Sequence, residues 1–333
     1  MKKTLLTICL VWMCFSLSAQ KIIDLSGKWS FSIDRQDNGE KEKWFSHTLN
    51  DFINLPGSMP EKLKGDEVTA KTQWTGSLYD SSYYYNPYME KYRKEGNIKF
   101  PFFLTPDKHY VGAAWYQKEV NIPADWKGER ILLFRERPHI ETTVWVNGQK
   151  TGMQNSLCVP HQYDITRYVR PGKCTITIRV DNRIKEINVG PDSHSITDQT
   201  QGNWNGIVGR ICLQTTPKTY FDDIQIYPEP EQKLARVKVV IKGTGTAKVK
   251  LSAESFNTDK KHIVPAIQQE IKLNKGVTET EMVLPMGNDM LLWDEFHPAL
   301  YKLKAEVTNG KKTEIKEIQF GMRRFEIKGK WFY

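Results

Sequence analysis

DQTQGNWNGIVGRICL, at Asp198–Leu213, sets polar amides and an indole between glycines before the chain returns to an apolar strand. Amide side chains hydrogen-bond sugar hydroxyls, and Trp204 offers a flat apolar face to a pyranose ring. Gly202, Gly206 and Gly209 allow backbone conformations that are closed to other residues. The pattern predicts a loop at a sugar pocket, and an ordinary turn around a buried tryptophan is an alternative of similar weight.

Short apolar or alternating runs, broken by Gly, Pro, Asn and Asp, recur along the whole chain. No amphipathic helical stretch of convincing length accompanies them, so the sequence predicts an all-β protein. The clearest strands of the first half are Leu25–Ile33, Ala114–Ile122, Arg130–Arg135, Thr142–Val146, Cys174–Val180 and Ile207–Leu213.

Asn147-Gly148 follows the strand at Thr142–Val146 and predicts a two-residue hairpin turn, because both residues accept positive φ. The strand places Val144 and Val146 on one face and Trp145 on the other. Both faces are partly apolar, so we expect this strand inside a sandwich. Trp145 is a candidate sugar platform, but a packed core residue is the favoured interpretation.

A domain boundary is expected near Thr215–Tyr220, where TTPKTY leaves the last strand of the first domain. About seven strands over roughly 100 residues follow, which is typical of an immunoglobulin-like sandwich. They are expected at Phe221–Tyr227, Arg236–Lys242, Ala247–Ser255, Glu270–Leu273, Glu279–Leu284, Tyr301–Thr308 and Thr313–Phe320.

Four motifs occur in a fixed order: TTVWVNGQKTG at Thr142–Gly152, VPHQYDIT at Val159–Thr166, the stretch at Asp198–Leu213, and LWDEFHPALYKL at Leu292–Leu303. Together they resemble glycoside hydrolase family 2, which contains β-galactosidases, β-glucuronidases and β-mannosidases. The similarity runs from about Leu25 to Tyr333. It implies an N-terminal jelly-roll sugar-binding domain, an immunoglobulin-like sandwich and then a catalytic (β/α)8 barrel.

The resemblance implies a jelly roll at 20–218, an immunoglobulin-like domain at 219–321 and the start of a barrel at 322–333. Here FGMRRFEIKGKWFY at Phe320–Tyr333 looks like the strand that leads into the barrel. Both catalytic glutamates of the family lie downstream of that strand, one of them in an Asn-Glu pair, and no asparagine of this chain precedes Glu. We therefore expect the non-catalytic N-terminal part of an exported β-glycosidase, whose partners are a β-glycoside or oligosaccharide and the catalytic barrel.

In family members a jelly-roll loop reaches the rim of the barrel pocket, and Thr197–Ile207 matches that loop here. The resemblance thus implies that Asp198 and Asn203 hydrogen-bond the carbohydrate and that Trp204 forms a wall. β-Galactosidases often carry an acidic residue close to this tryptophan, whereas Gln201 and two further non-acidic residues directly precede it here. The specificity for galactosides is therefore left open.

The segment Met286–Tyr301 is similar to a crossing loop of the family, in which Trp293 and Pro298 are expected to pin the loop to the second sandwich. A long aromatic insertion at Asp66–Gly112 is expected to cover the jelly roll or the barrel, although its rings could also stack on glycans. The alternative function is a stand-alone carbohydrate-binding protein that acts through Trp204 and this insertion.

Catalytic chemistry has little support in the chain itself. Retaining hydrolysis needs two carboxyl groups roughly 5–5.5 Å apart. Glu136 and Glu141 are the nearest candidates, and we expect them to be solvated or paired with Arg135 and Arg137 instead. Nucleotide, metal and Ser-His-Asp motifs do not occur in the sequence, which predicts no cofactor and no metal.

Two histidines have specific predictions. His161 is expected to be structural, with Asp164 and Thr166 ordering a turn beside it, and His194 is close enough in sequence to Asp198 to reach the pocket.

Met1–Ala19 has two lysines, an apolar run and a small-residue end, which predicts a secretory signal peptide and a periplasmic or extracellular protein. The run is too short to span a bilayer. Cys158, Cys174 and Cys212 follow it at wide spacing, and we expect buried thiols rather than disulfides. The net charge of +9 comes from scattered lysines, which argues against nucleic-acid binding.

Overall fold

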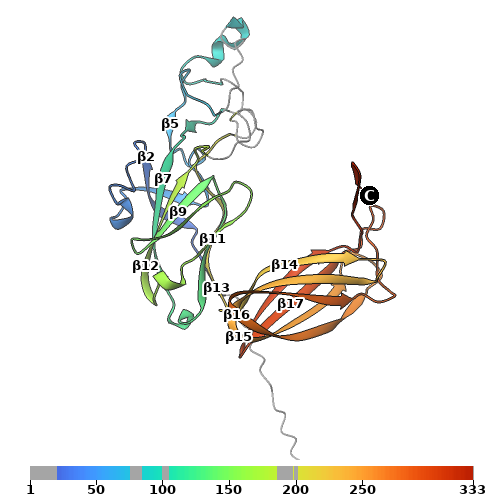
Figure 1. Cartoon of the computed structure of the whole chain (residues 1–333). Helices are drawn as coiled ribbons and strands as arrows, with labels where there is room; N and C mark the ends of the chain where they lie inside the picture. The colour runs from blue at the N-terminus through green and yellow to red at the C-terminus, as the bar shows by residue number, and fades with distance from the viewer. Residues whose placement is uncertain (1–20, 76–84, 100–104, 186–197, 199–201, 333) are drawn as a thin grey trace, which may run out of the picture. The chain divides into compact units, whose positions relative to one another are not determined.

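The computed structural model describes residues 21–75, 85–99, 105–185, 198 and 202–332. It divides into two compact units, Lys21–Thr215 and Thr216 onward, whose strands are drawn in Figure 1. Short 3-10 helices punctuate the first unit: η1 (Trp44–Ser46), η2 (Pro87–Tyr92), η3 (Ala124–Trp126) and η4 (Thr166–Tyr168). In the described part of the chain, no helix is long and apolar enough to cross a bilayer.

Two sheets face each other in the first unit. The larger has the order β10 (Gln149–Asn155), β9 (Glu141–Val146), β12 (Gly172–Asp181), β7 (Ala113–Ile122), β2 (Gly27–Asp34) and β3 (Asp51–Leu55), with antiparallel neighbours. The other has the order β1 (Ile22–Asp24), β13 (Gly206–Thr216), β8 (Arg130–Pro138) and β11 (His161–Asp164), and β4 (Gly57–Ser58) also pairs with β13.

Alternation of side chains along the strands builds the core between these sheets. On β12, Ile176, Ile178 and Val180 point into the shared core and are fully buried. Trp29, Phe31, Tyr116, Leu133 and Leu213 from the other strands fill the same core. Apolar residues at every second position of facing strands produce this kind of packed sandwich.

The outer face of the larger sheet is also covered. Trp145 stacks on Trp115 at 4.9 Å between ring centroids and on Phe45 at 5.1 Å, and Leu49 and Trp44 complete the cluster. Trp145 is only 2% exposed, so the favoured prediction of a core residue is confirmed and the sugar platform is wrong. The turn at Asn147-Gly148 is confirmed as well, because both residues have positive φ and join β9 to β10.

The aromatic insertion contains a short hairpin and η2. β5 (Asp66–Glu67) pairs with β6 (Lys108–His109). Tyr110 is buried, whereas Tyr85 and Tyr88 are 82% and 84% exposed. Cover for the jelly roll is thus confirmed only for part of the insertion.

The second unit has its own core and a main sheet of five strands: β14 (Tyr220–Glu229), β15 (Leu234–Ser255), β16 (Ile263–Pro285), β17 (Tyr301–Asn309) and β18 (Lys312–Phe320). β15 replaces two expected strands, because Gly243 and Gly245 form a bulge at which the strand bends without ending. β16 likewise includes two others, so all seven expected stretches are strands, but they form five continuous ones.

The loop before β17 is held as expected. Trp293 bridges to Pro298, its backbone N–H donates to the carbonyl of Met322, and Arg323 lies 4.8 Å above its ring. A last hairpin joins β19 (Ile327–Lys328) to β20 (Trp331–Phe332). The all-β prediction of a jelly-roll sandwich followed by an immunoglobulin-like sandwich is confirmed.

Candidate functional site

Asp198 ties the loop before β13 to a segment more than a hundred residues earlier. It is 2% exposed, and its Oδ1 accepts the N–H of Asn203 at 2.6 Å. Its Oδ2 accepts the N–H of Thr75 at 2.6 Å, and the backbone N–H of Asp198 donates to the carbonyl of Thr75. His109 Nε2 lies 3.5 Å from the same Oδ2. Asp198 therefore acts as a clasp between two loops.

Asn203 continues this clasp. It is 4% exposed, and its Nδ2 donates to the Oγ1 of Thr75 at 3.1 Å and to the carbonyl of Asn182 at 3.0 Å. Its Oδ1 has no hydrogen-bond partner among the described residues. The same amide nevertheless interacts with the buried imidazole of His139 and raises the pKa of that group.

Trp204 is the partly buried member of the predicted trio. Its ring stacks on His139 at 4.5 Å between centroids with 25° between the planes. His139 is itself buried, and burial lowers its pKa to about 4, partly offset by the neighbouring Asn203 and Asp198. A neutral imidazole therefore supports the tryptophan at neutral pH.

Two asparagines that sequence reasoning missed organise the same region. The Oδ1 of Asn205 accepts the hydroxyl of Tyr116 at 2.7 Å, and its Nδ2 donates to the carbonyls of Gly112 and Val180, each at 2.9 Å. Asn182 accepts the N–H of Gly112 at 2.8 Å. Both side-chain amides are fully buried. They hydrogen-bond backbone groups that have no strand partner where the strands end. The Asn-Gly step at Asn205-Gly206 was a sequence signal for Asn205, and Asn182 had none.

The glycines of the stretch have the predicted freedom, with φ of +72° at Gly202, +146° at Gly206 and +77° at Gly209. A Cβ on Gly206 would lie 2.5 Å from the carbonyl oxygen of Gly57, so the close approach of β4 requires glycine there.

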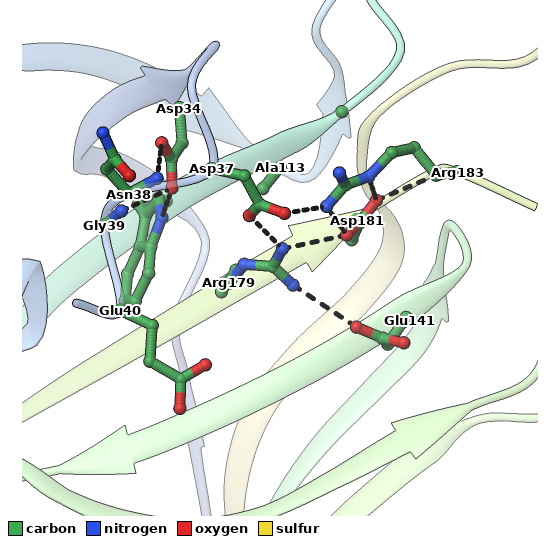
Figure 2. A network of polar contacts seen from close by, with 12 residues as sticks. Asp34, Asp37, Asn38, Gly39, Glu40, Ala113, Glu141, Arg179, Asp181 and Arg183 are labelled. Carbon is green, nitrogen blue, oxygen red and sulfur yellow. Dashed lines mark hydrogen bonds and ion pairs between the residues drawn. The ribbon is translucent and has the colours of Figure 1, made fainter. Parts of the chain in front are cut away.

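An ion network lies where β9 begins and β12 ends (Figure 2). The guanidinium of Arg179 contacts Asp37 at 2.6 Å, Asp181 at 2.9 Å and Glu141 at 3.3 Å. Burial alone would raise the pKa of Asp181, but hydrogen bonds from Arg183 and Lys185 hold it well below its usual range. The network fastens the loop after β2 to the outer face of the larger sheet.

The two glutamates considered for catalysis are both paired, but not with the expected arginines. Glu136 contacts Arg210 at 3.2 Å, and Glu141 contacts Arg179 and Lys185. Arg135 instead lies fully buried over the ring of Tyr163, at 4.3 Å. Ion pairing of both carboxylates favours a structural role for them.

His161 is structural, as expected. Its Nδ1 contacts the Oγ1 of Thr142 at 2.7 Å, and its Nε2 contacts the carbonyl of Ser156 at 3.1 Å. The carboxylate of Asp164 accepts both the N–H and the hydroxyl of Thr166, so the predicted turn is confirmed.

The remaining predictions have mixed outcomes. His194 and Gln201 lie outside the described residues. Cys174 and Cys212 are buried thiols as predicted, whereas Cys158 is exposed. In the described ranges no three His, Cys, Asp or Glu side chains are grouped to hold a metal ion.

Comparisons with known proteins agree with this architecture. The sequence model "Glycosyl hydrolases family 2, sugar binding domain" matches residues 22–217, and "Glycosyl hydrolases family 2" matches residues 219–323. A β-galactosidase from Clostridium acetobutylicum is 25% identical over 92% of this chain and 32% of its own length. A β-glucuronidase from Paenibacillus borealis is 24% identical over 94% of this chain and 47% of its own length.

Among solved structures, the β-glucuronidase of an uncultured Clostridium species aligns with a TM-score of 0.60 and 20% identity. The alignment covers 95% of this chain and 47% of the solved one. The chain thus spans less than half the length of these relatives.

Proposed function

Because the chain belongs to glycoside hydrolase family 2, we propose that it supplies the non-catalytic N-terminal part of an exported β-glycosidase. In this proposal the jelly roll spans 20–218, the immunoglobulin-like domain 219–321, and residues 322–333 begin a catalytic barrel. Two family models that match in order along 22–217 and 219–323 carry the proposal. The whole enzyme hydrolyses O-glycosyl bonds, and its named relatives act as β-galactosidases or β-glucuronidases.

An exposed apolar hairpin supports a further domain beside β19 and β20. Phe325, Ile327, Trp331 and Phe332 are 65%, 68%, 62% and 69% exposed, and the rings of Phe325 and Phe332 stack at 5.4 Å. Apolar side chains gathered in this way mark a surface that another body covers. We assign the catalytic barrel to that role.

The three residues predicted at the rim of the sugar pocket have separate roles in this proposal. Trp204, partly exposed and backed by His139, is the wall against which a sugar ring packs. Asn203 offers its Oδ1 to a hydroxyl, and Asp198 holds the loop through its two backbone hydrogen bonds. The apolar run at Met1–Ala19 supports export.

The test compares two proteins with nitrophenyl β-D-glucuronide, β-D-galactoside and β-D-mannoside. Residues 20–333 alone are expected to give no turnover, because the reaction needs a carboxyl pair that we place downstream. A protein extended through the reading frame after Tyr333 is expected to hydrolyse one of these glycosides. Hydrolysis by residues 20–333 would contradict the proposal.

A further inference from the structure

A polar cleft of about 480 Å³ lies in the first unit at the foot of the aromatic insertion. The short hairpin β5–β6 forms one side of it, and the turn after β5 forms another. Its volume falls within the roughly 300–1,000 Å³ that small-molecule sites occupy. Gly65 enables the hairpin to close, because a Cβ there would lie 3.0 Å from the carbonyl oxygen of His109.

The turn at 69–73 presents hydrogen-bonding atoms to this cleft. Thr72 Oγ1 accepts the N–H of Thr69, and Thr69 Oγ1 accepts the N–H of Lys71. Each hydroxyl therefore keeps its own proton for another acceptor. Gln73 donates its Nε2 to the carbonyl of Lys71 and keeps its Oε1 as an acceptor. Donors and acceptors at this spacing suit a ligand that carries several hydroxyls.

A buried imidazole forms part of the wall of the cleft. His109 lines the cleft and is 7% exposed, and its Nε2 has no hydrogen-bond partner among the described residues. This nitrogen lies 3.5 Å from the carboxylate of Asp198.

Of the charged residues at the cleft, one lysine remains after the ion pairs are assigned. Asp66 is paired with Arg35 at 2.5 Å, and Glu67 is paired with Lys108. Lys71 lines the same cleft and forms no ion pair with any described residue. An anionic group on the ligand would therefore find Lys71 available.

We propose that this cleft binds one acidic sugar unit, with the carboxylate on Lys71 and the hydroxyls on Thr69, Thr72 and Gln73. The inference rests on the proposed function only for the choice of a saccharide. The binding site itself is built from residues that the predicted rim at Trp204 does not include.

The test is calorimetric titration of the full chain with methyl β-D-glucuronide and methyl β-D-glucoside, which differ at the carboxylate. The glucuronide is expected to bind up to about fivefold more tightly, which corresponds to the upper range for an exposed ion pair. Lys71→Gln should remove that preference, and Gln73→Ala should weaken the binding of both ligands. Lys127→Gln is the matched control, because Lys127 is exposed after η3 and does not line the cleft.

Three outcomes would overturn the proposal: no binding of the glucuronide, a preference that survives Lys71→Gln, or displacement by an equal concentration of sulfate. The last would show a simple anion site. Because this titration involves no turnover, its failure leaves the comparison of nitrophenyl glycosides intact. That comparison fails only if residues 20–333 hydrolyse a glycoside.

Discussion

At the scale of single residues, buried amides complete the hydrogen bonds of backbone groups where the jelly-roll strands end. The side chain of Asn205 hydrogen-bonds a tyrosine hydroxyl and two carbonyls. These groups are buried, so water cannot take the place of Asn205. A buried group that loses its partner costs about 1–3 kcal/mol, which exceeds the net gain from one ordinary hydrogen bond. Asn205 therefore stabilises the region chiefly by preventing that cost.

Asn205→Ala is expected to lower the free energy of unfolding by about 3 kcal/mol, because Tyr116, Gly112 and Val180 each lose a partner. Urea unfolding followed by tryptophan fluorescence measures the change. Asn121→Ala is the matched control, since Asn121 is exposed on β7 and should change stability by less than about 0.5 kcal/mol. Equal effects of the two substitutions would contradict this role.

The buried His161 is expected to make the stability of the folded chain depend on pH. Burial, with a smaller effect from the charge of Arg135, lowers its pKa from 6.5 to about 4. Between these values the unfolded chain binds a proton that the folded chain does not, so the contribution to stability is complete above pH 6.5 and is lost as pH falls toward 4.

The measurement is urea unfolding at several pH values between 7 and 4. His161→Gln should lose about 1–3 kcal/mol less stability than the native chain over this interval, because its side chain does not titrate. His139 is present in both proteins, so its own lowered pKa cancels in the comparison. His47→Gln, at an exposed position, should behave like the native chain.

At the scale of elements, strand periodicity predicted what each strand buries but not what covers it. The alternation at Thr142–Val146 correctly indicated two buried faces. The cover over Trp145 comes from the loop after β2, about a hundred residues earlier, and is fastened by Asp37 to Arg179. Such a contact depends on the folded sheet and leaves no periodic pattern in the sequence.

The same limit explains the other differences. Glycines between β-rich runs indicated strand ends, yet Gly243 and Gly245 only bend β15, because their neighbours keep pairing with β16. Glu136 and Glu141 were assigned the arginines nearest in sequence, whereas their partners come from neighbouring strands. The sugar site at Asp198, Asn203 and Trp204 stays a prediction, and the clasp of its loop to Thr75 joins distant segments and could not be foreseen.

At the scale of the whole molecule, each unit has a separate hydrophobic core. Leu133 belongs to the core of the first unit and Leu251 to that of the second, and both are fully buried. A unit with its own core can unfold cooperatively by itself. The two sandwiches are therefore expected to unfold in two separate thermal transitions.

Leu251→Ala should shift one transition and Leu133→Ala the other. A buried Leu→Ala change costs about 2–5 kcal/mol, which corresponds to a decrease of roughly 8 °C or more in the Tm of a domain near 100 residues and of less for a larger one. Differential scanning calorimetry of residues 20–333 measures both transitions, and residues 216–333 alone should reproduce the one that Leu251→Ala shifts. If either substitution moves both transitions equally, the units share one cooperative core, because independent cores transmit no destabilisation to each other.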